Sequence, residues 1–378
     1  GQWLTSGYSL AMGIVMPLTA FLITQFSTKK LYLTAIILFI LGLIICIFAP
    51  NFIVLMTGRI LQAAGNGILS SMAQVILLTI YPAERRGSIM GWYGLSVTAV
   101  PVIAPTIAGI IIDHSGWRMI FYIVIAIMIL SFIVANFTFK DVLENHKKKF
   151  DTLSFILSGI AYAGLTIGVG NIGTSPFMST TVLLPILIGI VGITIFVRRQ
   201  FKESDPFLNL HILKNKTFLI SLIGSMLLYF AMMGSSIIIP LIVQSVKGLS
   251  ATTSGLVTLP GSLAMTILSP FAGKMYDQFG MRKLFITGSV VLVISNLGMV
   301  FTDLQTSLII LAAWNVLRCL AIGCLMMPLV TWGMSGLSVD LTAHGTALLT
   351  SLRTIAGAMG SAIFVSIMTY VAQQTHHV

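Results

Sequence analysis

Charged residues are scarce in this chain. Asp, Glu, Lys and Arg together make up 8% of its 378 residues, whereas hydrophobic residues make up 57%. Soluble domains carry about a quarter charged residues, and a mean hydropathy of +1.01 is far from that class. The composition therefore excludes a soluble globular domain. It predicts an all-α polytopic membrane protein, because hydrocarbon cannot satisfy free backbone polar groups.

Acidic residues are scarcer still, at 10 against 21 basic residues. They fall in loops or at the ends of the apolar segments. The resulting formal charge of +11 does not indicate nucleic-acid binding, because no basic stripe is interleaved with stacking aromatic residues. Membrane proteins instead collect Lys and Arg in their cytoplasmic loops. We therefore expect the lipid bilayer, and no nucleic acid, as a partner.

Several chemical signatures are also missing. The three cysteines, Cys46, Cys319 and Cys324, lie in apolar segments and suggest small buried hydrophobic residues more than a disulfide pattern. The sequence contains no Walker-type phosphate loop, no metal-spaced His/Cys cluster and no nucleophile elbow. These absences argue against an ATP-driven pump and against an enzyme. We expect neither a cofactor nor a metal.

Twelve apolar segments are present, and most reach the roughly 20 residues that a helix needs to cross a bilayer. We expect spans at about 5–26, 31–49, 53–80, 88–112, 119–139, 152–170, 181–197, 217–244, 252–276, 284–301, 307–337 and 346–372.

Basic residues fix the orientation of these spans. Fifteen of the 21 Lys and Arg residues lie in one set of alternate loops, and four lie within spans. The other set of loops holds two, Arg118 and Lys247. The richer set is expected on the cytoplasmic side, so both ends of the chain are expected on the outer side. We expect a multi-pass protein of the plasma membrane, and a bacterial one.

One segment occurs twice. Residues 269–284 read SPFAGKMYDQFGMRKL and residues 17–31 read PLTAFLITQFSTKKL, so that Pro17 and Lys30 precede Pro270 and Lys283 by 253 residues each. Each copy joins two apolar segments. A duplicated charged hairpin of this kind is typical of transporters built from internal repeats. The first copy is less complete than the second, and it has Thr24 in the place of a carboxylate.

The repeat predicts two pseudo-symmetric helical bundles with two intervening helices. The first four spans match the last four, with Gly87 answering Gly345. Two further spans lack a counterpart, which predicts a parent protein with one more helix at each end. We expect an N-terminal bundle over 1–139 without its first helix, cytoplasmic loops and two linker helices over 140–216, and a C-terminal bundle over 217–378 without its last helix.

The second hairpin carries the strongest candidate for a moving contact. Gly273 permits close helix approach, Asp277 lies at a helix end, and Gly280 permits a tight turn. Arg282 and Lys283 begin the next helix. A carboxylate beside two cations can hold the hairpin to a neighbouring helix end in one conformation and release it in another. The alternative is that these charges only set topology.

Three arginines lie inside spans, where a cation is costly and usually marks a pathway or a paired site. Arg59, in GRILQAAGNG, lies near Gln62 and can bond to it, to backbone carbonyls or to water; alternatively it extends to the outer surface. Arg318 and Arg353 lie in the second half, and Arg318 answers Arg59. They suggest a cavity that accepts anions, or structural bonding to backbone carbonyls.

The fourth span, GLSVTAVPVIAPTIAGIIID, contains Pro101 and Pro105 one turn apart, with Gly109 on its smooth face. Such prolines bend a helix and can let it rock against its partner, although ordinary kinked packing is the alternative. Asp113 closes this segment on the outer side. We expect this span and the twelfth to pack at the interface between the bundles.

These motifs resemble those of the major facilitator superfamily, in particular the fourteen-span drug:proton antiporters of the EmrB/QacA type. GKMYDQFGMRK looks like the family's cytoplasmic loop motif, and GRILQAAGNG looks like its fourth-helix motif, which is associated with proton transfer. AVPVIAPTIAGIIID is similar to the fifth-helix antiporter motif, with Ala104 and Ala108 in place of two glycines. GWRMIFYI and PFLNLHILKN are also typical of the fourteen-span group.

The resemblance implies a monomeric secondary transporter that exports small, largely apolar compounds in exchange for protons by alternating access. In that account Arg59, Gln62, Asp113, Arg318 and Arg353 belong to the proton and substrate pathway. The Asp277 hairpin gates the cytoplasmic side. The alternatives are a metabolite facilitator or importer on the same fold, and a transport-inactive fragment.

Overall fold

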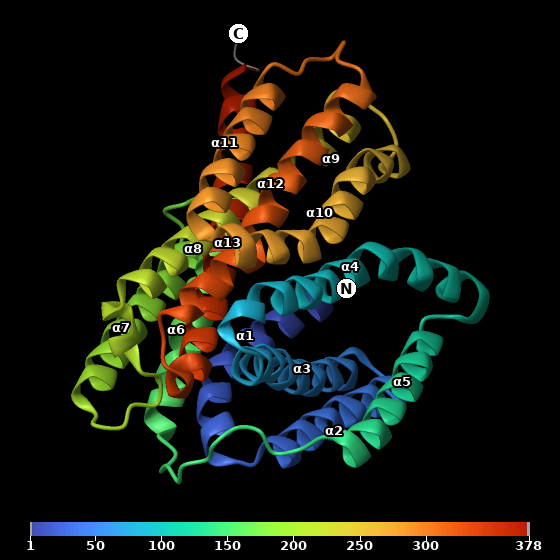
Figure 1. Ribbon diagram of the computed structural model, residues 1–378. Coiled ribbons are helices and arrows are strands. Elements are labelled where there is room, and N and C mark those ends of the chain that lie inside the picture. Colours follow the sequence, from blue (N-terminus) through green and yellow to red (C-terminus); the bar gives the residue numbers. More distant parts are fainter. Residues whose placement is uncertain (1, 376–378) are drawn as a thin grey trace.

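The computed structural model describes residues 2–375, apart from the side chains at positions 2, 3, 5, 6, 105, 106, 173 and 375. All regular structure in this part of the chain is helical (Figure 1). The α-helices are α1 (Gln2–Gln25), α2 (Thr28–Ile47), α3 (Phe52–Ile80), α4 (Arg86–Ser115), α5 (Arg118–Thr138), α6 (Thr152–Gly170), α7 (Thr180–Lys202), α8 (Lys216–Ser235), α9 (Ile238–Pro240), α10 (Ala251–Phe279), α11 (Met281–Val300), α12 (Leu308–Ser335) and α13 (Thr342–Thr375). Short 3₁₀ turns are η1 (Ala83–Arg85), η2 (Asn171–Gly173), η3 (Leu210–Lys214) and η5 (Val339–Leu341), and η4 (Leu241–Val246) is π-helical.

Twelve helical runs within the described residues are long and apolar enough to cross a membrane, which confirms the expected number. The eighth is composite, because α8, α9 and η4 together cover Lys216–Val246. Pro240 has no N–H to donate, and the helix widens into the π-helical η4 directly after it.

Contacts between loops separate two faces of the molecule. The first turn of α2 meets the loop after α5, where the Lys29 amide donates to Asp141 Oδ1 at 2.9 Å. We call this side, with the basic loops, the basic face. On the opposite face the Arg118 guanidinium donates to the Ile47 carbonyl at 3.1 Å, and the Lys247 ammonium donates to the Leu304 carbonyl at 2.9 Å. Thus the two basic residues of the poorer loops each hold a neighbouring loop on that face.

The helix pairing follows a pseudo-two-fold relation between the two halves. Helices α1 to α4 correspond to α10 to α13. The α2–α3 and α1–α3 pairs are repeated as α11–α12 and α10–α12. Between the halves, α4 packs on α10 and α13 packs on α1. The pseudo-two-fold relation maps one of these contacts onto the other. The fourth and twelfth spans therefore both lie at the interface between the halves.

One position in this relation has no counterpart. In the second half, α8 packs closely against both α12 and α13. Within residues 2–375, no helix packs in that way against both α3 and α4, which correspond to α12 and α13. The outer part of α4 is accordingly exposed, as Val100 and Ile107 illustrate.

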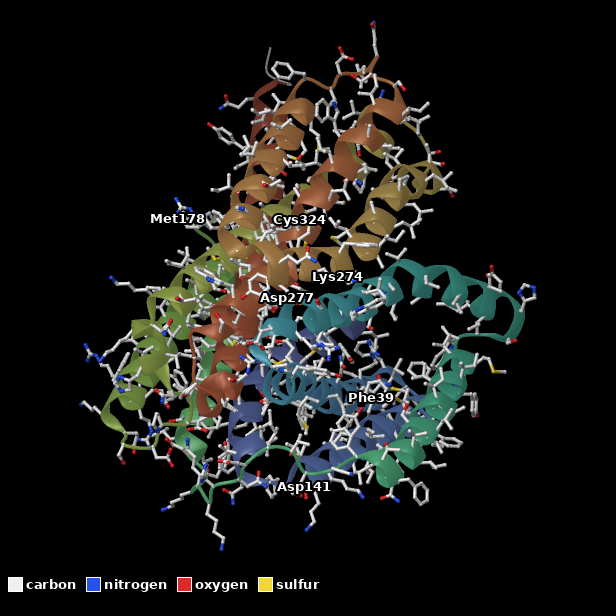
Figure 2. The ribbon with its side chains drawn as sticks, in the orientation of Figure 1. Phe39, Asp141, Met178, Lys274, Asp277 and Cys324 are labelled. Carbon is white, nitrogen blue, oxygen red and sulfur yellow. The ribbon has the colours of Figure 1, made fainter. Side chains whose placement is uncertain are left out.

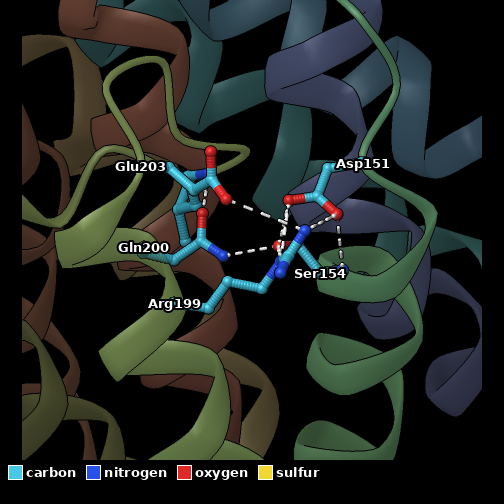
Figure 3. Close-up of polar contacts among 6 residues, drawn as sticks. Asp151, Ser154, Arg199, Gln200 and Glu203 are labelled. Carbon is cyan, nitrogen blue, oxygen red and sulfur yellow. Dashed lines mark hydrogen bonds and ion pairs between the residues drawn. The ribbon is translucent and has the colours of Figure 1, made fainter.

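The intervening helices α6 and α7 form a close pair. A methyl group at Gly164 would lie 2.8 Å from the Gly189 amide, so the two backbones touch. At the basic face Asp151 caps α6 and takes two hydrogen bonds from the Arg199 guanidinium, each of 3.1 Å (Figure 3). Gln200 joins the same network by donating to Ser154 Oγ at 2.7 Å. The two helices are therefore fixed to each other as a unit.

This network determines the charge of Asp151. Burial disfavours the ionised carboxylate, but hydrogen bonds from Arg199 and Ser154 outweigh it and hold the pKa of Asp151 below its usual value. Because the pKa is lower in the folded state, the network stabilises the fold above the unfolded-state pKa of about 4. That stabilisation is lost as the pH falls through the folded-state value.

We therefore expect Asp151→Asn to lower the melting temperature of the purified protein at pH 7 and to reduce the loss of stability on acidification toward pH 3. Thermal unfolding in detergent across that pH range measures both effects. Asp340→Asn, which changes an exposed carboxylate in η5, is the control. Identical pH profiles for Asp151→Asn and the unsubstituted protein would show that the network does not contribute.

Candidate functional site

The two halves approach most closely where α4 meets α10, and glycine makes the contact possible. A side-chain carbon at Gly273 would overlap the Gly87 carbonyl, and one at Gly91 would lie 2.6 Å from the Ser269 carbonyl. Ser269 Oγ donates to the Gly91 carbonyl at 2.9 Å. Because Gly87, Gly91 and Gly94 recur at intervals of one helical turn, α4 presents a bare backbone to α10.

Asp277 of α10 lies at this contact with α4 (Figure 2). Its carboxylate accepts hydrogen bonds from the backbone amides of Gly87 and Ser88, at 3.0 and 2.8 Å, and from Ser88 Oγ at 2.7 Å. The amides belong to the first turn of α4, where N–H groups lack intrahelical partners. The carboxylate also lies at the positive end of the helix dipole. An acid from one half thus caps a helix of the other half.

The rest of the hairpin shapes the turn that carries Asp277. Gly280 has a φ of 77°, a conformation that L side chains rarely adopt. Arg282 is exposed in the first turn of α11, and the Lys283 ammonium lies 5.8 Å from the centre of the Phe279 ring. No ion pair joins Asp277 to either cation among the described residues. The carboxylate therefore holds a helix end, without a salt bridge.

The first copy of the hairpin makes no equivalent contact. Thr24 donates back to the Ala20 carbonyl of its own helix at 2.5 Å. Thr346, which follows Gly345 as Ser88 follows Gly87, has a buried hydroxyl with no hydrogen-bond partner in the described part of the chain. The α4–α10 contact is thus polar at its end, while the α1–α13 contact is not.

A hydrophobic cluster closes the basic face between the halves. It includes Met72 of α3 and Met90 of α4 from the first half, with Val330 of α12 and Leu349 of α13 from the second. All four side chains are almost fully buried. The segment before α8 adds Phe207, Leu208, Leu210 and Ile212 to the same cluster. The basic face is therefore sealed by side chains from both halves and from the intervening segment.

The halves separate toward the opposite face. Figure 1 shows α4 and α10 side by side near the centre and diverging toward their other ends. Pro101 and Gly109 lie in this part of α4, where Pro101 is exposed and no atom lies within 4 Å of a side-chain carbon built on Gly109. Asp113 is exposed near the end of α4. The side chain of Pro105 lies outside the described residues.

Arg59 lies two turns into α3 from the opposite face. Its guanidinium donates to Gln62 Oε1 at 2.9 Å and lies 4.2 Å from the centre of the Tyr8 ring in α1. Gln62 is buried, whereas Arg59 is partly exposed. The cation is thus held by an amide and an aromatic ring, with no carboxylate beside it among the described residues.

The other two arginines are buried. Arg318 donates to Ser235 Oγ at 2.5 Å and to Asn315 Oδ1 at 2.9 Å. The Arg353 guanidinium lies 4.6 Å from the centre of the Tyr229 ring, while its Nε and Nη1 atoms are buried without a hydrogen-bond partner in the part of the chain described. Each cation therefore retains some capacity to attract an anionic group.

Of the predicted pathway residues, the structure joins Arg59 to Gln62 and leaves the others apart. No hydrogen bond or ion pair within residues 2–375 links Arg59, Asp113, Arg318 and Arg353. Sequence reasoning missed Ser88, Ser269, Gly91 and Gly94 at the α4–α10 contact. The glycine spacing in GSIMGWYG is the signal that could have identified the last two.

Comparison with known proteins agrees with these observations. The family model of the Major Facilitator Superfamily matches residues 1–361. The Bacillus subtilis MFS-type transporter YhcA is 38% identical over 368 residues, covering 97% of this chain and 69% of that protein. The lincomycin resistance protein LmrB of Listeria monocytogenes is 33% identical, covering 97% of this chain and 78% of its own length.

A solved structure supports the fold. The human organic anion transporter MFSD10 superimposes with a TM-score of 0.72 at 13% identity, covering 97% of this chain and 77% of that one. These relatives are transporters rather than enzymes. Taken with twelve membrane-spanning helical runs and bacterial homologues, they show that the chain belongs to the Major Facilitator Superfamily, as a multi-pass transporter of the bacterial plasma membrane.

Proposed function

We propose that this transporter exports small, largely apolar compounds, including antimicrobial drugs, in exchange for protons. The observation that carries the proposal is the Asp277 contact, because it joins a helix end of one half to a hairpin of the other and can be made or broken as a unit. Similarity to a lincomycin resistance protein supports drugs as cargo.

Alternating access provides the mechanism. The basic face, cytoplasmic by its charge, is closed by the hydrophobic cluster, while α4 and α10 diverge toward the opposite face (Figure 1). This arrangement corresponds to an outward-facing state. Opening toward the cytoplasm requires α4 and α10 to part near Asp277. Hydrogen bonds to a charged group contribute about 1.5–3 kcal/mol each, so the contact can shift the balance between the two states substantially.

Arg59 supplies the fixed charge for proton coupling in this scheme. Its cation lies near the outer end of α3 with Gln62 as its hydrogen-bond partner. A nearby positive charge favours the ionised form of an acid, so Arg59 would hold a coupling carboxylate ionised until protons arrive from outside. Asp113, exposed at the outer end of α4, would be the first acid on that route.

Arg318 and Arg353 form the second part of the proposed pathway. Both are buried with N–H groups that no described residue satisfies, and they attract the polar end of a substrate. We further propose that the protein works as a monomer. An additional helix beside α3 and α4, in the position equivalent to that of α8, would complete the N-terminal bundle.

Drug extrusion by cells that express the full-length protein tests the proposed function. A protonophore should abolish extrusion of lincomycin from energised cells, because the proton gradient drives export. An ATPase inhibitor applied while the gradient is maintained should leave extrusion unchanged. Extrusion that persists after the gradient collapses would instead indicate a facilitator.

We expect Arg59→Ala to abolish coupled export without preventing membrane insertion. The substitution removes the fixed cation but leaves the packing of α3 largely intact, since Arg59 is partly exposed. Drug resistance and the amount of protein in the membrane are the two measurements. Arg198→Ala, at an exposed site near the end of α7, is the matched control. Full resistance conferred by Arg59→Ala would refute its role.

We expect Asp277→Asn and Gly273→Ala to open the basic face. The first substitution removes the charged acceptor, and the second separates α4 from α10 because the added methyl group overlaps the Gly87 carbonyl. A cysteine introduced by Met90→Cys, which is buried in the closed state, should then react with an impermeant maleimide in inverted vesicles. Turnover by Asp277→Asn should fall several-fold.

Two variants serve as controls for this experiment. Gly255→Ala lies on the same helix as Gly273 but has no atom within 4 Å of the added carbon, and Asp340→Asn alters an exposed carboxylate. Labelling of Met90→Cys should remain low in both. Equal labelling in all four backgrounds would rule out the Asp277 contact as a cytoplasmic gate.

A further inference from the structure

The linker helix α6 lies across the interface between the two halves. It packs against α1 of the first half and against α13 of the second. Tyr162 of α6 packs directly on α1, because a side-chain carbon at Gly13 of α1 would overlap the Tyr162 ring. This ring is 5% exposed. In η2, directly after α6, the Ile172 carbonyl accepts a hydrogen bond of 3.3 Å from Ser366 Oγ of α13. Thus α6 is fixed to both halves, as well as to α7.

A cavity of about 740 Å³ lies between α1, α6, α8 and α13. This volume falls within the range of roughly 300–1,000 Å³ that is typical of sites for drug-sized ligands. Hydroxyl groups on all four helices line it, together with apolar side chains. The hydroxyls belong to Ser9, Tyr162, Thr166, Tyr229, Thr354 and Ser361.

The lining determines the charge of a suitable ligand. Among the residues that the structure describes, no Asp, Glu, Lys, Arg or His side chain lines the cavity, so a charged ligand would lose its hydration without gaining an ion pair. Tyr229 separates the cavity from Arg353, whose guanidinium lies 4.6 Å from the ring centre. This cation further disfavours a positively charged ligand. Hydroxyl donors and acceptors suit a neutral molecule with several polar groups.

We propose that this cavity is a binding site for an uncharged, drug-sized amphiphile, with the linker helix α6 as one of its walls. The apolar part of the ligand lies against residues such as Met233, and its polar groups bond to the hydroxyls. Tyr229 contacts both the ligand and Arg353, so a bound ligand changes the surroundings of this buried cation of the pathway. As a site for exported cargo it rests on the proposed function, but binding itself does not depend on proton coupling.

Gly170 offers a way to block the cavity without disturbing its packing. It lies at the end of α6, lines the cavity, and has no atom within 4 Å of an added side-chain carbon. Gly170→Trp should therefore fill the entrance. Gly255→Trp is the matched control, since Gly255 also lies in a helix with open space around it but away from the cavity.

Binding of radiolabelled chloramphenicol, a neutral hydroxylated amphiphile, to the purified full-length protein tests the proposal. We expect saturable binding that weakens at least tenfold in Gly170→Trp and is unchanged in Gly255→Trp. Thr166→Val, which keeps the shape but removes one hydroxyl, should weaken binding about threefold. The permanent cation ethidium should not compete for this site.

Several outcomes would overturn the proposal. The first is an absence of saturable binding, which is expected if lipid alone fills the cavity. The second is an affinity that Gly170→Trp leaves unchanged. The third is that ethidium displaces chloramphenicol from the unsubstituted protein but not from Gly170→Trp. A different result is that export does not depend on the proton gradient while Gly170→Trp still weakens binding. That result would refute the proposed antiport but would support this binding site.

Discussion

Hydrocarbon cannot form hydrogen bonds, and that constraint determines most of this structure. Each span is helical because only a helix satisfies its own backbone groups in lipid. Hydroxyl side chains within the spans bond back to carbonyls one turn earlier, as Thr79 does to Val75. The groups that are not satisfied locally include the first amides of α4 and, among the described residues, buried atoms of Arg318, Arg353, Thr166, Ser225, Thr346 and Ser351. These are the places where the two halves, or a ligand, must supply the missing partner.

The spans were predictable from sequence because two patterns with the same cause agree. The apolar runs are long enough to cross the bilayer, and the basic residues are concentrated in alternate loops between them. The close approach at Gly273 was also suggested by its residue type. The partner of Asp277 was not, because backbone amides leave no mark in a sequence. Nor could the position of α6 be foreseen, since the intervening helices have no counterpart in the repeat. Residues near Pro240 form a π-helix that hydropathy does not reveal.

The two interfaces between the halves are related by the pseudo-two-fold, but they differ in chemistry and in how closely their helices pack. The α4–α10 interface is bare glycine backbone closed by a carboxylate. The α1–α13 interface lacks that carboxylate and is covered by α6 through Tyr162. The pseudo-symmetric scaffold is common to both, and Thr24 stands where the second repeat has Asp277. We propose a moving contact at the first interface and a ligand site beside the second.

The donors that Asp277 engages are chiefly main-chain amides, and this shapes how the protein can evolve. No substitution at Gly87 or Ser88 deletes a backbone N–H, apart from proline, so selection can act on the interaction almost entirely through the acceptor and through the space around it. A change in the codon of Asp277 can therefore remove the charged acceptor in one step, while the two amide donors remain. The first repeat has Thr24 at the corresponding place, so it has no carboxylate to offer the equivalent helix end.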